Sequence, residues 1–308
     1  LARRLGISRS AVWKAIEELR RDGCAVEAVT RRGYRLAAGT DLLSAEGIRA
    51  FLPEGSPWQI TCLETVGSTN RAARELAQSG APHGTVVAAD RQTEGRGRFG
   101  RSFYSPPGTG VYLSAVLRPA VTAEEAGLLT AGAAVAVCRA VRALSAAEPQ
   151  IKWVNDIFVQ GRKAGGILTE AATSLESGML EYAVLGVGLN CSLPPEGFPP
   201  ELRDTAGPLF PAGAGEPPSR NRLAAEVLVQ LQRMLEEGLG RGCLEEYRAL
   251  STVLGKDVWV LRGEDREEAH ALEIDDEGRL VVQTKEGIRR LRSGEVSLRL
   301  KAQDSPAR

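Results

Sequence analysis

The chain contains few of the residues on which several common catalytic mechanisms depend. It has two histidines in 308 residues, His83 and His270, and neither stands in a pattern typical of a catalytic base. We expect His83, which lies between Pro82 and Gly84, in an exposed turn. A Ser/His/Asp or Cys/His mechanism therefore lacks a candidate base.

Cysteine is also scarce and scattered. The five cysteines, at positions 24, 62, 138, 191 and 243, are an odd number and include no C-x-x-C pair. This pattern supports neither a disulfide framework nor a zinc site. We expect each thiol to be a small buried side chain in a reducing compartment.

Excess charge and long apolar runs are missing as well. Lysine plus arginine and aspartate plus glutamate each number 39, and 43% of the residues are hydrophobic. No apolar run approaches the roughly 18 residues of a membrane span, and the residues after Leu1 are charged, unlike a signal peptide. We expect a cytoplasmic protein without a membrane segment, divided into two or three domains.

The chain does contain a loop rich in arginine and glycine, from Gly95 to Arg101. Glycine leaves consecutive backbone N–H groups exposed, and arginine supplies a fork of donors that matches phosphate oxygens. The segment therefore predicts a grip on a phosphate or polyphosphate. It also fits the letters G-x-G-x-x-G, but Pro106-Pro107-Gly108 follows where a dinucleotide fingerprint requires a helix. A solvated basic loop is the other alternative.

The first 35 residues are locally basic, with nine lysines or arginines against four acids. Leu1 to Leu5 predicts a short helix, and Ser8 is the expected N-cap of a second helix that runs to about Asp22. The buried face of the second helix is predicted to contain Ala11, Val12, Ala15, Ile16 and Leu19. A short hairpin with its tip at Thr30 to Gly33 follows.

Two helices followed by a basic hairpin are typical of a winged helix-turn-helix, in which the second helix enters the DNA major groove and the wing contacts phosphates. The residues predicted to contact DNA are Arg9, Ser10, Trp13, Lys14, Arg31 and Arg32. The alternative is an amphipathic helical pair with a solvated outer face. Because the chain begins inside the motif, we expect a further helix before it.

Residues 45–250 alternate predicted strands and helices, and three polar clusters interrupt them. Ser68-Thr69-Asn70 precedes a predicted helix and could cap it or hold a ligand. Between Lys152 and Gly166, Asp156 could be a base or a magnesium ligand, and Lys163 a carboxylate or phosphate clamp. The alternative is a charged hairpin with Lys163 at its tip. In the strand from Gly186 to Asn190 the terminal amide could contact a purine.

The remaining segments are simpler. Residues 194–220 are rich in proline and glycine and predict a surface loop, which is followed by two helices up to residue 250. From Gly255 five short alternating runs predict strands, with Asp276-Glu277-Gly278 as a turn. This pattern predicts a small β-barrel.

In their order and spacing, these motifs resemble the biotin protein ligases of the two-function kind, in which a winged-helix repressor is fused to the ligase. The resemblance covers nearly all 308 residues. It implies an α+β multidomain fold with three parts. They are a winged helix-turn-helix at 1–38, a catalytic domain with a mixed sheet similar to class II aminoacyl-tRNA synthetases at 45–250, and an SH3-like β-barrel at 254–303.

The resemblance also implies a two-step reaction and its partners. Biotin and ATP, with Mg²⁺, form biotinyl-5′-AMP, and a lysine of a biotin carboxyl carrier protein domain then attacks this adenylate. The adenylate is expected to act as corepressor and to favour a homodimer. Binding to operator DNA is expected once the helix that precedes Leu1 is restored. A lipoate-type ligase, or an adenylate-sensing transcription factor without transfer activity, is the alternative.

The same resemblance assigns roles to individual residues. It implies that Lys163, Arg98 and Asp156 are catalytic, with Asp156 as a base or as a Mg²⁺ ligand. The implied biotin-binding residues are Ser68, Thr69, Asn70, Gln92, Gly95, Arg96, Arg98, Lys163 and Gly166. The implied ATP and adenylate contacts are Arg98, Arg101, Lys152, Trp153, Asn155, Lys163 and Asn190. Val154 and Phe103 depart from the family, which usually has proline and often tryptophan at these positions.

Overall fold

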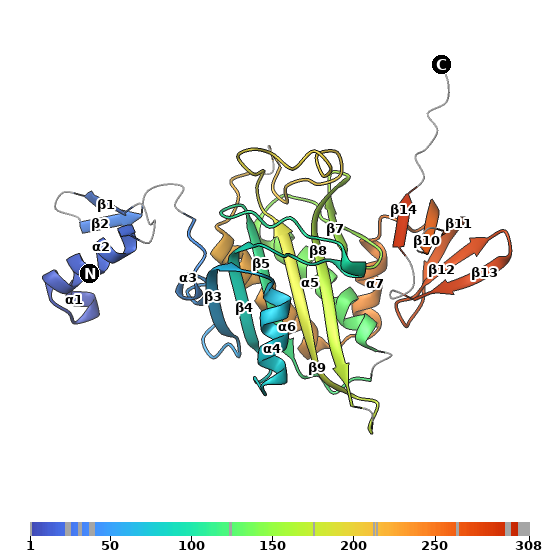
Figure 1. Cartoon of the computed structure of the whole chain (residues 1–308), viewed down its shortest axis with the longest axis horizontal. Helices are drawn as coiled ribbons and strands as arrows, with labels where there is room; N and C mark the ends of the chain where they lie inside the picture. The colour runs from blue at the N-terminus through green and yellow to red at the C-terminus, as the bar shows by residue number, and fades with distance from the viewer. Residues whose placement is uncertain are drawn as a thin grey trace, which may run out of the picture.

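The computed structural model describes residues 2–21, 26–29, 33–36, 41–122, 125–174, 176–211, 213, 215–262, 265–292 and 297–300. Three groups of elements follow one another along the chain (Figure 1). They are a helical pair with a hairpin, a seven-stranded mixed sheet with helices, and a five-stranded antiparallel sheet. This arrangement confirms the predicted fold class.

The first group contains α1 (Ala2–Leu5), α2 (Arg9–Arg21), β1 (Val26–Val29) and β2 (Gly33–Leu36). Ser8 caps α2 as predicted, because its Oγ accepts a hydrogen bond from the backbone N–H of Ala11 at 3.1 Å.

The predicted buried face of α2 is only partly correct. Val12 and Ile16 pack against Val26 in a small core. In contrast, Ala15 is exposed and Leu19 is 41% exposed, because this small core contacts only a narrow stripe of the helix.

The central sheet has the strand order β3-β4-β5-β9-β8-β7-β6. The strands are β3 (Gln59–Val66), β4 (Thr85–Gln92), β5 (Gly110–Leu117), β6 (Gln150–Lys152), β7 (Asp156–Val159), β8 (Arg162–Thr173) and β9 (Leu180–Asn190). β3 and β4 pair in parallel, and every other described pair in this sheet is antiparallel.

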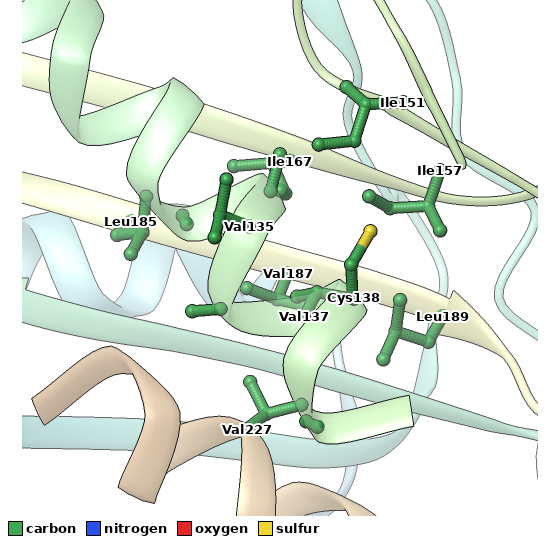
Figure 2. Close-up of a cluster of buried hydrophobic side chains, with 14 of the residues drawn as sticks. Val135, Val137, Cys138, Ile151, Ile157, Ile167, Leu185, Val187, Leu189 and Val227 are labelled. Atoms are coloured by element: carbon green, nitrogen blue, oxygen red, sulfur yellow. The ribbon is translucent and has the colours of Figure 1, made fainter. Parts of the chain in front are cut away.

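Helices cover both faces of this sheet. The helices are α3 (Ala45–Arg49), α4 (Thr69–Gln78), α5 (Ala126–Leu144), α6 (Arg220–Glu237) and α7 (Arg241–Ala249). On one face, Ala73 and Ala77 of α4 pack against Val87, Val116 and Val184. On the other face α5 forms the main core, where Figure 2 shows Val135 and Cys138 among branched side chains of the sheet.

Helix α5 requires a correction to the expectation of no long apolar segment. Among the described residues, Ala126–Leu144 is the one helix long and apolar enough to cross a membrane, by length and composition alone. Its side chains are mostly buried, and they pack against the sheet, α6 and α7 inside the protein.

The third group is a sheet with the order β13-β12-β11-β10-β14. Its strands are β10 (Asp257–Arg262), β11 (Asp265–Ile274), β12 (Leu280–Thr284), β13 (Gly287–Leu291) and β14 (Ser297–Leu300). All five follow the predicted runs. Val258, Ala271 and Leu280 join the same core as the central helices, so this sheet is packed onto the central part of the molecule.

The segment 194–219 is less exposed than predicted. Phe198, Leu209 and Phe210 are buried, because the segment runs along the end of the sheet and bonds to it through its backbone. The N–H of Lys163 donates to Thr205 O at 2.8 Å, and the N–H of Gly207 donates to Lys163 O at 2.9 Å. The segment therefore fixes the backbone of a predicted site residue.

Candidate active site

A cavity of about 290 Å³ lies where the start of α4, strands β8 and β9, and the arginine loop meet. It brings together polar residues that are far apart in the sequence. Its lining includes Ser68, Thr69, Asn70, Gln92, Arg96, Arg98, Arg101, Lys152, Trp153, Asn155, Asp156, Lys163 and Gly166. Of the residues expected in the site, Gly95 and Asn190 are not part of this lining.

Hydroxyl and amide groups form the wall of the cavity beside α4. Gln92 Oε1 accepts hydrogen bonds from the N–H of Thr69 at 2.9 Å and from its Oγ1 at 3.1 Å. Ser114 Oγ, on the buried strand β5, donates to Thr69 Oγ1 at 2.8 Å and is 2.6 Å from Asn70 Oδ1. The side chains of Thr69 and Asn70 are therefore held in fixed orientations. Sequence analysis missed Ser114, although a serine within an apolar strand is a detectable signal.

The first backbone N–H group of α4 is not capped by the serine hydroxyl at the N-cap position. Ser68 occupies the N-cap position, but its side chain makes no capping hydrogen bond. The amide of Gln92 takes this role for the N–H of Thr69. Capping by the Ser68 hydroxyl is thus wrong, and this buried hydroxyl lines the cavity instead.

Gln92 also fixes the residues that follow the arginine loop in the sequence. Its Nε2 donates to Ser105 Oγ at 2.9 Å, and Ser105 Oγ donates to Phe103 O at 3.0 Å. Phe103 N in turn donates to Gly95 O at 2.8 Å, which closes the base of the loop. Gly95 is buried there, and a Cβ on it would overlap Phe103 O. Gly95 thus shapes the loop without lining the cavity.

The glycines of β9 allow neighbouring side chains to approach the sheet closely. A Cβ on Gly186 would overlap Asn70 Oδ1, and one on Gly188 would lie 2.7 Å from Phe103 Cε1. Asn70 and Phe103 therefore occupy space that any side chain on these glycines would fill.

A lysine–aspartate pair also lines the cavity. Lys163 Nζ is 2.6 Å from Asp156 Oδ1. An ideal Cβ on Gly166 would lie 3.6 Å from both atoms, so this glycine leaves the pair open to the cavity. Asp156 contributes the one carboxylate among the described lining residues.

The carboxylates available in the cavity decide whether it fits the predicted Mg²⁺. No group of three or more His, Cys, Asp or Glu side chains that could hold a metal occurs among the described residues. Mg²⁺ keeps waters and binds through one or two carboxylates when substrate phosphates supply the other ligands. The cavity therefore fits Mg²⁺ that arrives with a nucleotide, with Asp156 as the available protein ligand.

Arg98 of the arginine loop bonds to a side chain of the cavity lining. Arg98 Nη1 donates to Asn155 Oδ1 at 3.2 Å, while Asn155 Nδ2 donates to Ile167 O at 2.8 Å. Burial lowers the pKa of Arg98 from its usual value, but a guanidinium remains protonated near neutral pH.

The other loop residues have different surroundings. Arg96 Nη1 lies 3.6 Å from Glu170 Oε1, and Arg101 is exposed. Phe99 at the loop tip has a φ of 56° and is 55% exposed.

Two elements outside the cavity lining form hydrogen bonds to the segment 152–156. The hydroxyl of Tyr247, on α7, donates to Val154 O at 2.8 Å. The indole Nε1 of Trp153 donates to Gly278 O at 3.1 Å, in the turn between β11 and β12. Lys152 Nζ lies 5.5 Å from the centre of the Phe158 ring. A turn of the C-terminal sheet thus supports a residue of the cavity wall without lining the cavity itself.

Asn190, which was expected to contact adenine, lies outside the cavity lining. It is 9% exposed at the end of β9, its Nδ2 lies 3.5 Å from Gly207 O, and its O accepts from Leu209 N at 2.6 Å. The backbone carbonyl of Asn190 thus fastens the segment 194–219 to the sheet, and its side-chain amide lies against the same segment.

The predicted DNA-contacting residues of α2 lie at the surface. Arg9, Ser10 and Lys14 are exposed, and Trp13 is 55% exposed. Arg31 and Arg32, at the expected wing tip, lie outside the described residues. The exposed indole, hydroxyl and cations form the outer face of α2.

Comparison with known proteins agrees with each part of the molecule. Residues 62–190 match the biotin/lipoate A/B protein ligase family, residues 1–35 match an HTH domain, and residues 253–299 match the biotin protein ligase C-terminal domain. The structure resembles the biotin protein ligase of Aquifex aeolicus solved in complex with biotin and ATP, with a TM-score of 0.65 and 27% identity. That similarity covers 79% of this chain and 99% of the other.

Two relatives extend the match along the whole sequence. The bifunctional ligase/repressor BirA of Bacillus subtilis is 39% identical over 300 residues, which are 96% of this chain and 91% of that protein. The bifunctional ligase/repressor BirA of Escherichia coli is 31% identical over 303 residues, covering 97% and 91%. With this identity sustained from the helix-turn-helix to the C-terminal sheet, the chain belongs to the family of bifunctional ligase/repressor proteins.

Proposed function

We propose that the chain joins biotin to a lysine of a biotin carrier protein, using ATP and Mg²⁺, and represses transcription through its helix-turn-helix. The observation that carries this proposal is that the Lys163–Asp156 pair and Arg98 line the same cavity as a wall of hydroxyl and amide groups. The hydroxyl and amide groups suit the uncharged ureido ring of biotin. The cationic groups suit a carboxylate and phosphates.

In the first step, Ser68, Thr69, Asn70 and Gln92 bind the ring of biotin, and Lys163 orients its carboxylate. One carboxylate oxygen attacks the α-phosphorus of ATP, while the bond to pyrophosphate breaks. Lys163 stabilises the negative charge that accumulates on the phosphate oxygens. Asn155 orients Arg98 within the cavity lining, because its Oδ1 accepts a hydrogen bond from the guanidinium.

In the second step, the amine of a carrier lysine attacks the acyl carbon of the adenylate, and AMP leaves. A lysine amine with a pKa of about 10.4 must lose a proton to become nucleophilic at neutral pH. Asp156 accepts this proton, since it is the carboxylate of the described lining. Holding Mg²⁺ during the first step is the alternative role of Asp156.

The arginine loop retains the adenylate between the two steps. Its base is fixed by Gly95 and Phe103, while Phe99 at its tip is exposed. Ordering of Arg98, Phe99 and Arg101 over the adenylate excludes water from the mixed anhydride, which protects it from hydrolysis.

The adenylate also acts as corepressor and favours a homodimer. β3 lies at the edge of the central sheet, and an unpaired strand edge is a template for pairing with a second chain. α2 then binds operator DNA through Arg9, Ser10, Trp13 and Lys14, with Arg31 and Arg32 on the wing. These activities require ATP and access to DNA, so we place the protein in the cytoplasm.

The test is incubation of the chain with radiolabelled biotin, MgATP and a biotin carrier domain. We expect release of pyrophosphate and label on the carrier. Release without labelling would indicate an adenylate-sensing factor without transfer activity. Labelling by lipoate in preference to biotin would indicate a lipoate-type ligase.

A further inference from the structure

Glu170 lies next to the candidate active site but was not predicted as part of it. Successive side chains of a strand point to opposite faces, so Gly166, Leu168 and Glu170 share the face of β8 toward α4. Gly166 and Leu168 line the cavity. Glu170, whose side chain is 24% exposed, follows at the edge of the cavity.

The carboxylate of Glu170 joins three elements. Its Oε2 accepts a hydrogen bond from Asn70 Nδ2 at 2.9 Å. Its Oε1 lies 3.5 Å from Arg74 Nη1 on α4 and 3.6 Å from Arg96 Nη1 on the arginine loop. The first contact orients a residue of the hydroxyl and amide wall. The last is an ion pair between the sheet and the loop.

We propose that Glu170 is a positioning residue. It holds the N-terminal part of the arginine loop through Arg96 and thereby slows release of the adenylate. This inference rests on the proposed function and extends it. The contact gives Arg96 a structural task in addition to its place in the cavity lining, because it fixes the loop to the sheet.

The two contacts of Glu170 can be separated by substitution. Glu170→Gln keeps an oxygen that accepts from Asn70 but removes the charge that holds Arg96 and Arg74. Loss of a partly exposed ion pair predicts a roughly fivefold faster release of preformed biotinyl-5′-AMP. The single-turnover rate of adenylate formation at saturating substrates should change less than about twofold, since no group that touches the substrates is removed.

Two matched controls identify the partner. Arg74→Gln removes the other arginine of Glu170 and should leave release unchanged. Glu64→Gln makes the same change at an exposed glutamate of β3 and should also have no effect. Because the pair with Arg96 is partly exposed, the ratio of release rates between Glu170→Gln and wild type should fall as salt is added.

A double-mutant cycle distinguishes positioning from a general effect on structure. If Glu170 acts through Arg96, the double variant E170Q/R96Q should release adenylate no faster than R96Q alone. Additive effects, or unchanged release in E170Q, would overturn the inference. Should E170Q fail to fold, R96Q still tests the inference, because release at the wild-type rate would overturn it. A wild-type chain that forms no adenylate would instead overturn the proposed function, and the inference with it.

Discussion

Lys163 Nζ and Asp156 Oδ1 lie 2.6 Å apart on neighbouring strands of the central sheet. A cation paired with a carboxylate is held in place before any substrate is present. In the proposed function, the carboxylate of biotin and the phosphates of ATP compete with Asp156 for the same ammonium group. The pair sets the position of Lys163 in the cavity lining.

Replacing Lys163 should impair the first step of the reaction. Removal of one positioned donor to a transition-state oxyanion costs about 2.7 to 4 kcal/mol. Lys163→Ala should therefore slow adenylate formation a hundredfold or more, as measured by pyrophosphate release in a single turnover. An unchanged rate would remove Lys163 from the first step.

Replacing Asp156 should separate its two candidate roles. If Asp156 accepts the proton of the carrier lysine, Asp156→Asn should slow transfer from preformed adenylate and spare adenylate formation. The measurement is the rate of carrier labelling when purified adenylate replaces biotin and ATP. The reverse pattern would assign Asp156 to Mg²⁺ binding.

Arg98→Gly should affect retention of the adenylate. The substitution removes the contact with Asn155 and frees the backbone at the loop tip, so the loop should close less firmly over the ligand. We expect adenylate to form but to appear in the medium, where it would biotinylate lysines of unrelated proteins. Chromatography of the filtrate after brief incubation measures the loss, and normal retention would count against this role.

Arg220 should be important for stability and not for catalysis. It is 4% exposed, pairs with Asp41 and Asp90, and donates to the backbone of Asp41. Arg220→Met would leave both carboxylates without this partner and should lower the free energy of unfolding by about 3 kcal/mol. Urea unfolding measures the loss. Arg222→Met changes an exposed arginine on the same helix and should cost less than about 0.5 kcal/mol.

His83 should make stability depend on pH. It was expected in an exposed turn, but its ring stacks on Trp58 and its Nδ1 accepts from the N–H of Arg118 at 3.2 Å. Burial lowers the pKa of His83. The unfolded chain, with a histidine pKa of about 6.5, therefore binds the proton more readily than the folded chain does.

The stability contributed by His83 is thus present above pH 6.5 or so and declines as the pH falls below that value. His83→Asn retains an acceptor for Arg118 without the titration and should weaken this decline. Melting temperatures between pH 7.5 and 5 test the prediction, with His270→Asn as the matched change at an exposed histidine. Equal declines in wild type and His83→Asn would contradict it.

The sequence predicted those elements whose periodicity is set by burial on one side. Residues 9–21 form α2 close to the predicted bounds, because Ser8 supplies the N-cap and apolar residues recur at helical spacing. The prediction failed for Leu19 and for the segment 194–219. Apolar spacing does not show how large a core a helix meets, and proline with glycine does not show whether a loop bonds to a sheet.

The candidate site was predictable where residue type and chemistry coincide. Lys163, Asp156 and Arg98 are charged groups in glycine-rich surroundings, and the fold brings them to one cavity. Ser114 and Glu170 were missed because their contacts with Asn70 join strands β5 and β8 to α4. Such contacts depend on strand order, which local patterns do not determine.

The bond from the Trp153 indole to Gly278 O has a consequence for protein engineering. A shortened ligase that ends near residue 250 would lose the support behind Trp153, which lines the cavity. Attempts to miniaturise the enzyme for labelling applications should therefore keep the turn at 275–279, or graft another backbone acceptor at the same place.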